Sequence, residues 1–408
     1  MHRFKNYLNV KKISKTIIGS LLVLSIANQA LAEDKPNRGK FYGDIRLRYE
    51  TASQDNALED ADAVTVRTRL GYQSPSAQGF SGLIEIEGVT ELVDDFSFPP
   101  AGIRPGQFSV IADPEGLEID QALVQYTNDD LSVKIGRQVI ALDGHRFVGH
   151  VGWRQDRQTF DAIRVNYKPT KGFVINVSYL DQRNRIFSDE VDIESEDVIL
   201  NSAFTTSFGK FVGYAYLLEE DTEVGNEIDT YGISFNGSKA SGENKFSYAA
   251  EFAVQEINDS FDAEYLKLEG GITFGVGGGN KITAKVGYEL LGSDNGLAGF
   301  TTPLATLHKF NGWSDQFLAT PSQGLEDLYA GLWGPALGGN WVVVYHDFSS
   351  DESLNGSDDL GSELNLLYTR KFGKGFSGGV KYADYSAGDA DFNRVDTQRA
   401  WLWGAYSF

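Results

Sequence analysis

The 408-residue chain contains no cysteine, a single methionine and only 10 prolines. The absence of cysteine excludes disulfide bonds and thiol chemistry. No run of about 18 apolar residues occurs, so the sequence provides no transmembrane helix. Positive charge is also scarce, because 36 lysines and arginines stand against 57 acids and the net charge is -21. This balance excludes sequence-independent nucleic-acid binding, which requires a basic surface.

The first 32 residues differ in composition from the rest of the chain. They contain five cations and no acid. An apolar run follows the cations at residues 16–27, and Ala30-Leu31-Ala32 supplies the small residues of a signal peptidase site. We predict a secretory signal at residues 1–32 and a mature chain at 33–408, with an uncleaved N-terminal anchor as the alternative. Cleavage would remove the five cations and change the net charge from -21 to -26.

Apolar and polar residues alternate with a period of two along most of the chain after residue 39. In residues 41–49 the odd positions are apolar or small, and the even positions are mostly charged. Residues 64–72 and 282–290 repeat this arrangement. Successive side chains of a β-strand point to opposite faces, so these segments predict strands with one apolar face. Helical periodicity is almost absent, and an all-β fold is expected.

Eighteen such segments occur, and each approaches the roughly nine to eleven residues that a tilted membrane strand needs. They are predicted near residues 40–50, 63–73, 80–90, 117–126, 131–140, 160–168, 173–180, 198–207, 210–218, 228–237, 244–254, 265–274, 280–291, 325–333, 340–349, 361–372, 376–385 and 397–408. The connections between them alternate strictly between short and long. Outer-membrane barrels have short periplasmic turns and long external loops. We therefore expect a single transmembrane antiparallel β-barrel of 18 strands, with both termini in the periplasm of a Gram-negative bacterium.

A barrel of this size predicts a pore. In lipid every backbone N–H and C=O needs an internal partner, so a spanning sheet must close on itself. Eighteen strands enclose an interior too wide for side chains to fill, and it holds water unless loops fold inward. The fold alone does not select a solute.

The strand register assigns charged side chains to the lumen. If Ile45 and Leu47 face lipid, Arg46 must face the lumen, because an arginine on the lipid side at mid-membrane costs on the order of 2–4 kcal/mol. The same rule points further cations inward: Arg48, Arg67, Arg69, Lys134, Arg164, Lys285 and Lys381. Arg137 has the opposite parity from Lys134, and a bulge would be needed to redirect it. Its direction is left open.

Several acids are also expected to face the lumen: Glu85, Glu87, Glu251, Glu289 and Glu363. In one interpretation they pair with the arginines and stabilise the wall. In the other, the arginines form a constriction that selects anions, because a guanidinium binds carboxylates bidentately and stays charged. Many other acids fall in long loops such as residues 189–197, where divalent ions could bridge them to lipopolysaccharide.

Two ordered sets of residues carry a resemblance to a known family. The first comprises Gly136-Arg137-Gln138, Gly144, Arg146, Val148-Gly149, Trp153-Arg154-Gln155, Arg157 and Phe160-Asp161-Ala162-Ile163-Arg164. The second comprises Phe300-Thr301-Thr302-Pro303, His308, Gly312, Asp315, Phe317, Gly324-Leu325 and Asp327-Leu328-Tyr329, with Gly361 and Glu363 in the closing strands. With these residues, the chain resembles the alginate export family of outer-membrane channels.

The resemblance implies an eighteen-stranded channel whose arginine-lined constriction passes alginate, a linear polyanion. It implies pore-lining roles for Arg137, Arg154, Arg157 and Arg164, with Asp161 orienting one or more of them. The candidate pore-lining set from pattern and resemblance together is Arg46, Arg48, Arg67, Arg69, Arg137, Arg154, Arg157, Arg164, Asp161, Lys285 and Glu363. The expected solute is an anionic polysaccharide, oligosaccharide or small anion that passes by diffusion. No cofactor or metal ion is expected, and no enzymatic activity.

The chain ends in Trp401-Leu402-Trp403-Gly404-Ala405-Tyr406-Ser407-Phe408. A terminal phenylalanine preceded by apolar or small residues at alternate positions resembles the signature that marks outer-membrane barrels for assembly. The expected partners are therefore the barrel assembly machinery during biogenesis, and outer-membrane lipid and lipopolysaccharide afterwards.

Other functions remain open. The barrel could be a general or specific diffusion porin for other small solutes, or a structural or adhesive barrel whose loops bind partners. An enzyme could use His145, His150, His308 or His346 as a base, but no G-x-S-x-G nucleophile motif is present. The long connection at residues 292–324 is rich in apolar residues and could fold inward as a gate.

Overall fold

The computed structural model describes residues 38–189, 191–221 and 226–408, so the predicted signal at residues 1–32 lies outside the described residues. The strands are β1 (Lys40–Gln54), β2 (Ala61–Gln73), β3 (Phe80–Asp95), β4 (Gly116–Thr127), β5 (Leu131–Gln138), β6 (Thr159–Thr170), β7 (Phe173–Asn184), β8 (Ile186–Asp189), β9 (Ile193–Thr205), β10 (Lys210–Glu219), β11 (Glu227–Ser241), β12 (Asn244–Ile257), β13 (Phe261–Gly275), β14 (Lys281–Leu291), β15 (Ser293–Asp294), β16 (Ala298–Gly299), β17 (Leu325–Ala336), β18 (Gly339–Leu354), β19 (Ser357–Gly373), β20 (Phe376–Ser386) and β21 (Thr397–Ser407). Four single-turn 3₁₀ helices, η1 (Pro99–Ala101), η2 (Asp143–His145), η3 (Leu307–Lys309) and η4 (Ala390–Phe392), lie in connections.

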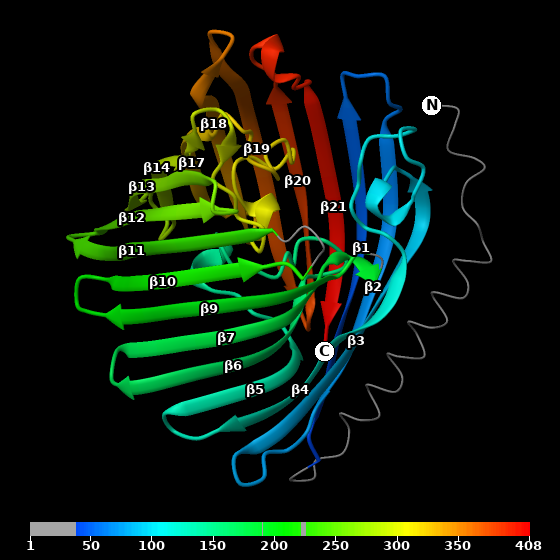
Figure 1. Ribbon diagram of the computed structural model, residues 1–408. Helices are drawn as coiled ribbons and strands as arrows, with labels where there is room; N and C mark the ends of the chain where they lie inside the picture. The colour runs from blue at the N-terminus through cyan, green and yellow to red at the C-terminus, as the bar shows by residue number, and fades with distance from the viewer. Residues whose placement is uncertain (1–37, 190, 222–225) are drawn as a thin grey trace.

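Eighteen of the strands form one antiparallel sheet that closes into a barrel (Figure 1). Each strand pairs with its neighbours in sequence, apart from the short strands β8, β15 and β16, which lie in connections. The barrel closes where β1 pairs with β21 over eleven residue pairs, from Asp44 opposite Ser407 to Gln54 opposite Thr397. The prediction of an all-β barrel of 18 strands is confirmed.

The strand boundaries differ from the predicted ones mainly at the ends that carry long connections. Strands β3 and β18 each continue five residues beyond the predicted segment, to Asp95 and Leu354. Strand β9 begins at Ile193, within a stretch that was predicted as loop. The ladder continues there because neighbouring strands still offer backbone partners, which sequence alternation does not register. No helix in the described ranges is long and apolar enough to cross a membrane.

The distribution of side chains is the reverse of that in a water-soluble sheet protein. Leu47 is 49% exposed, whereas its neighbour Arg48 is 1% exposed. Ile84 and Ile135 are likewise exposed, whereas Glu85 is buried. An apolar exterior and a polar interior are the signature of a membrane-spanning barrel.

The chain reaches the same end of the barrel at Gly43 and Phe408. The two residues exchange backbone hydrogen bonds of 3.1 and 3.0 Å. The short turns, such as residues 128–130 and 242–243, lie at this end, and the long connections lie at the other. Since short turns face the periplasm in outer-membrane barrels, this is the periplasmic end.

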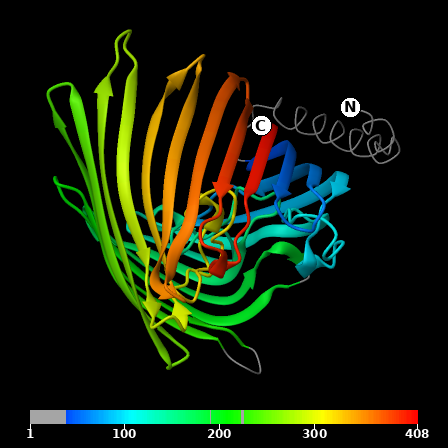
Figure 2. The same cartoon turned by 90° about the horizontal axis from the view of Figure 1, so that it is seen from above.

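Two long connections fold into the barrel (Figure 2). We call residues 139–158 the first inward loop and residues 292–324 the second inward loop. Ile140 of the first loop and Phe300 of the second are 0% exposed, and they pack in one apolar cluster with the wall residue Tyr265. The second loop therefore folds inward, which was one of the alternatives that the sequence left open. A third connection, residues 96–115, forms a smaller apolar cluster with Ala52, Ala61 and Ala63 of the wall.

Candidate functional site

The two inward loops bind each other inside the barrel. The Gly149 N–H donates to the Leu304 carbonyl at 2.8 Å, and the Thr306 N–H donates to the His145 carbonyl at 3.0 Å. The Gln158 amide donates to the Leu304 carbonyl at 3.2 Å. Because the loops leave the wall from β5 and β14, their junction spans the interior. We call the joined loops the constriction.

Two of the predicted lumen-facing arginines hold the first inward loop. Arg46 donates from Nε to Gln155 Oε1 at 2.8 Å, and from its terminal nitrogens to the carbonyls of Gly152 (3.2 Å) and Trp153 (3.0 Å). Arg48 donates to the Trp153 carbonyl at 2.5 Å, and its guanidinium lies 5.3 Å from the centre of the Trp153 ring. Both arginines point inward, as their parity predicts. Their donors bind loop backbone, so they are anchors of the constriction.

A buried carboxylate of the wall binds the first inward loop, and through it is linked to the second. Glu50 of β1 forms ion pairs with Arg48 and Arg154 at 3.2 Å and with Arg399 of β21 at 3.4 Å. Arg154 of the first loop also pairs with Asp315 of the second loop at 2.6 Å. Removing one member of a buried ion pair costs about 3–5 kcal/mol, because the partner charge remains without compensation. This network therefore fixes the position of the constriction.

His308 lies between a carboxylate and an ammonium group. Its Nδ1 is 2.6 Å from Asp315 Oδ1, and its Nε2 is 2.7 Å from Lys381 Nζ. An ammonium group can only donate, so Nε2 accepts and Nδ1 carries the proton donated to Asp315. Burial, reinforced by the Lys381 charge, lowers the pKa of His308 to about 3. The imidazole is therefore neutral at neutral pH and bridges Asp315 and Lys381.

Three tryptophans surround the same ammonium group. Lys381 Nζ lies 3.9 Å from the ring centre of Trp313, 4.4 Å from that of Trp153 and 5.2 Å from that of Trp401. Trp313 and Trp153 come from the two inward loops, and Trp401 comes from β21. Lys381 is 5% exposed, so these cation–π contacts form away from water, where they are strongest.

The second inward loop has its own anchor on the opposite part of the wall. Glu289 of β14 pairs with Arg146 of the first loop at 2.9 Å. It also accepts hydrogen bonds from the Tyr265 hydroxyl at 2.6 Å and from the Asn311 amide at 2.8 Å. Arg146 donates to Thr302 Oγ1 at 3.2 Å. Glu289 thus binds both inward loops directly.

Glu363 belongs to the candidate set, and it binds the second inward loop. Its carboxylate accepts hydrogen bonds from the backbone N–H groups of Trp313 and Ser314, the latter at 3.0 Å, and from the Ser314 hydroxyl. Gly312 adjoins the carboxylate so closely that a Cβ at this position would lie 2.3 Å from Glu363 Oε2. The contact between this acid and the loop therefore depends on glycine.

Four further predicted cations, three on the wall and one on the first inward loop, pair with acids of the wall. Arg69 Nε lies 2.9 Å from Asp44 Oδ1 and 3.0 Å from Glu87 Oε2, and Arg67 also bonds to Asp44. Arg157 of the first loop binds Asp120 at 2.9 Å and Glu85 of β3. Lys285 binds Glu269 at 2.9 Å. The first of the two interpretations, in which acids and arginines stabilise the wall, describes these residues.

Arg137 and Asp161 lie on the outside of the wall, which differs from their assignment to the pore. Arg137 binds Asp161 bidentately, with 2.8 and 3.0 Å distances. Arg137 shares a strand face with Ile135, and Asp161 shares one with Ile163, and both isoleucines are about half exposed. No register shift occurs in the pairings of β5 with β4 or β6, so Arg137 keeps the outward parity of Ile135. Arg137 and Asp161 thus form an ion pair on the outer face of the wall.

Arg164 differs from the rest of the predicted set. It lies directly opposite Lys134 across the β5–β6 pairing, and both side chains are partly buried in the lumen. Arg164 donates to Asn176 Oδ1 at 3.3 Å, which is an uncharged partner. Within the described residues, neither Arg164 nor Lys134 forms an ion pair with a carboxylate. Two neighbouring cations thus present uncompensated charge to the interior.

Sequence reasoning assigned no structural role to several residues that join the loops to the wall. Asp315, Asn311, Trp313 and Asp113 lie in connections, where period-two alternation gives no direction. Asp113 pairs with Arg48 and accepts a hydrogen bond from the Gln155 N–H at 2.8 Å. The inward-facing arginines could have indicated such residues, because a buried guanidinium group requires hydrogen-bond or ion-pair partners.

Comparisons with known proteins agree with this architecture. Residues 38–290 match the family described as alginate export. No curated protein matches the chain in a sequence search.

Solved structures share the fold at low sequence identity. OccAB4 of Acinetobacter baumannii superposes with a TM-score of 0.72 and 14% identity over 92% of this chain and 100% of that chain. OccK5 of Pseudomonas aeruginosa gives a TM-score of 0.63 and 12% identity over 91% and 98% of the two chains. The outer-membrane protein OpdK of the same species, also solved with vanillate, gives 0.66 and 11% over 90% and 98%.

Proposed function

This chain belongs to the alginate export family, and from that premise we propose that its barrel passes small anions and anionic oligosaccharides by passive diffusion. The barrel is an outer-membrane channel of the type found in Gram-negative bacteria, surrounded by lipid and lipopolysaccharide. The family and the structural neighbours are channels and not enzymes. The choice of an anionic solute is the proposal.

The cation pair of Lys134 and Arg164 is the observation that supports this choice. Like charges directly opposite each other on a sheet destabilise it. Several other cations of the wall pair with acids, for example Arg69 with Asp44 and Lys285 with Glu269. A cation pair kept without a carboxylate is therefore suited to a passing anion, whose charge compensates it in transit.

Lys309 extends this positive potential to the constriction. It lies exposed on the second inward loop, with its ammonium group 2.7 Å from the Gly144 carbonyl. The described residues give it no ion pair with a carboxylate. Lys134, Arg164 and Lys309 thus form a set of cations whose charge is available to solute.

The paired arginines of the candidate set have a different role in this proposal. The N–H groups of Arg46 and Arg48 donate to carbonyls of the first inward loop, and those of Arg154 donate to Glu50. These arginines therefore hold the loops that narrow the channel. A solute then meets a narrowed path positioned by arginines and a potential set by the uncompensated cations. This division differs from the expectation that the arginines themselves select the anion.

The chemistry of the solute is a carboxylate in our proposal. One structural neighbour, OpdK, was solved with vanillate, an aromatic carboxylate. Uronate sugars carry one carboxylate per residue, so oligouronates of increasing length are suitable test solutes. Arg164 offers the planar bidentate recognition that carboxylates favour.

The test is the reversal potential of the refolded barrel in a planar bilayer under a KCl gradient. We expect anion selectivity in the wild-type channel despite the net charge of -21, and a clear loss of it in the double variant Lys134→Gln/Arg164→Gln. The matched control is Lys171→Gln/Lys374→Gln, which removes two cations from exposed periplasmic turns. A cation-selective wild type, or a lumen variant that behaves like the control, would contradict the proposal.

A further inference from the structure

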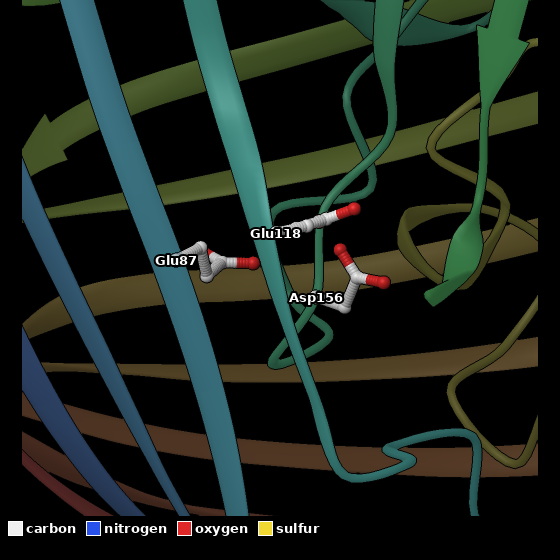
Figure 3. A group of neighbouring side chains, drawn as sticks. All are labelled: Glu87, Glu118 and Asp156. Atoms are coloured by element: carbon white, nitrogen blue, oxygen red, sulfur yellow. The ribbon is translucent and has the colours of Figure 1, made fainter. Parts of the chain in front are cut away.

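Three carboxylates meet where the first inward loop touches the wall (Figure 3). Glu87 of β3 and Glu118 of β4 lie directly opposite each other in the strand register. Asp156 approaches them from the first inward loop, between Gln155 and Arg157. One oxygen from each of the three groups lies within 4.8 Å of the other two. Three separate segments therefore place oxygen atoms around one point.

The space between these groups is small and is lined by the same residues. A cavity of about 10 Å³ is lined by Glu87, Glu118 and Asp156, together with Val89, Pro114 and Gly116. This volume corresponds to about one water molecule or one ion. Glu87 is 1% exposed and Asp156 is 4% exposed, so bulk water does not solvate their charges.

Glu87 has an oxygen atom that the protein does not satisfy. Arg69 approaches Oε2 at 3.0 Å, and Arg67 lies 3.9 Å from the same atom. Glu87 Oε1 is buried and accepts no hydrogen bond. Figure 3 shows the Glu87 carboxylate directed toward Glu118 and Asp156. A buried carboxylate oxygen without a donor is costly, and a cation in the cavity would remove that cost.

We propose that Glu87, Glu118 and Asp156 bind a hard divalent cation, with Ca²⁺ as the ion of choice. Oxygen-only ligands from carboxylates suit Ca²⁺ and exclude the softer metals that need nitrogen or sulfur. A divalent ion would also offset negative charge of the three carboxylates, among which Glu87 lies 3.0 Å from Arg69 and 3.9 Å from Arg67. Ca²⁺ accepts irregular arrangements of oxygen ligands, whereas Mg²⁺ requires nearly ideal octahedral geometry.

The ion would fasten the first inward loop to strands β3 and β4. The residues on either side of Asp156 already bind the wall, Gln155 to Thr65 Oγ1 at 2.8 Å and Arg157 to Asp120 at 2.9 Å. The ion adds a third attachment between them. This inference concerns the stability of the constriction, and it does not depend on which solute the channel passes.

Calcium titration of the refolded barrel in detergent tests the site. After EDTA treatment and removal of the chelator, CaCl₂ is titrated in a calorimeter into wild type, Glu87→Gln, Glu118→Gln and the control Glu243→Gln. Glu243 is exposed in a periplasmic turn, so its loss changes the charge equally and leaves the cluster intact. The thermal midpoint is measured with and without CaCl₂, since a ligand that binds the folded state raises it.

We expect one saturable Ca²⁺ site per wild-type chain. Each cluster variant should weaken its affinity at least about tenfold, because ligand charge sets calcium affinity, and the control should retain it. Calcium should raise the thermal midpoint of wild type and control only. Absence of saturable binding to wild type, or undiminished binding by both cluster variants, would overturn the proposal and assign the cluster to carboxylates that share a proton. If Glu87→Gln does not fold, Glu118→Gln decides alone, because its side chain is less buried.

Discussion

The ammonium nitrogen of Lys381 lies 3.9 Å from the centre of the Trp313 ring. Lys381 belongs to strand β20 of the wall, and Trp313 belongs to the second inward loop. The contact therefore joins the membrane-spanning part of the barrel to the segment that narrows it. Stability of the barrel and width of the passage are coupled at this point.

Replacement of Lys381 by methionine is expected to loosen the constriction. The variant keeps most of the side-chain volume and loses the cation–π contacts and the hydrogen bond to His308. We expect the free energy of unfolding to fall by about 1–3 kcal/mol and the single-channel conductance to rise or fluctuate more. Urea unfolding followed by tryptophan fluorescence and bilayer recording measure the two effects. Lys171→Met, in an exposed turn, is the control. Equal unfolding free energies and conductances for the two variants would show that the contact of Lys381 with Trp313 does not stabilise the constriction.

Alanine at Gly149 is expected to separate the two inward loops. A Cβ at this position would lie 2.3 Å from Thr306 Oγ1 and 2.9 Å from the Thr306 nitrogen. The loops must then move apart, at a cost of about 1–3 kcal/mol for overpacking. We expect a lower thermal midpoint and a higher conductance. The control is Gly213→Ala, whose Cβ would meet no atom within 4 Å. An unchanged conductance in Gly149→Ala would mean that the junction of the loops does not limit ion flow.

The barrel is expected to lose stability in mild acid through His308. Burial lowers the pKa of this imidazole from its ordinary value of 6.5 to about 3. Between these values the unfolded chain binds a proton that the folded chain does not, so the free energy of unfolding falls as the pH decreases. The slope approaches about 1.4 kcal/mol per pH unit for one proton. His308→Gln can still donate to Asp315 and accept from Lys381, and its stability should fall less between pH 6.5 and 4. Urea titrations across this range measure the difference, and parallel curves for the two proteins would refute the assignment.

Arg137 is expected to have no influence on ion selectivity. Its guanidinium binds Asp161 on the outer face of the wall, away from the lumen. Arg137→Gln should therefore leave the reversal potential unchanged, whereas Arg164→Gln should shift it toward cations. The two variants remove the same charge from nearby strands, so each controls for the other. A shift with Arg137→Gln as large as that with Arg164→Gln would place both groups along the ion path.

The sequence predicts the wall well because the bilayer imposes one rule on every strand. Residues such as Leu47 and Arg48 must face opposite sides, so the parity of a segment fixes its register. The alternation of short and long connections adds the orientation. The strand count and the inward direction of Arg46, Arg48, Arg67 and Arg69 follow from these two patterns. Arg137 differs because the resemblance suggested a pore role, while its parity pointed outward.

The constriction could not be predicted in the same way. Arg154 and Asp315 are 161 residues apart, and their contact depends on two irregular segments meeting inside the barrel. No periodicity in the sequence fixes the direction of the side chains in such segments. An apolar loop is therefore compatible both with a gate inside the barrel and with an external surface. The sequence supplied the charges, but the pairing of acids with arginines depends on distances that only the folded chain defines. The same holds for Lys134 and Arg164, which form no ion pair with a carboxylate among the described residues.

The barrel closes through the pairing of β1 with β21, so closure requires the last strand. Strand β1 obtains one of its two neighbours only when Thr397–Ser407 is in place. A chain interrupted earlier would leave an open edge, which hydrocarbon cannot solvate and which invites pairing with other chains. Contacts between the two extremes of the sequence also make closure slow relative to local pairing. Loss of the final strand should therefore abolish the barrel as a whole, so nonsense mutations late in the coding sequence are expected to be as damaging as early ones.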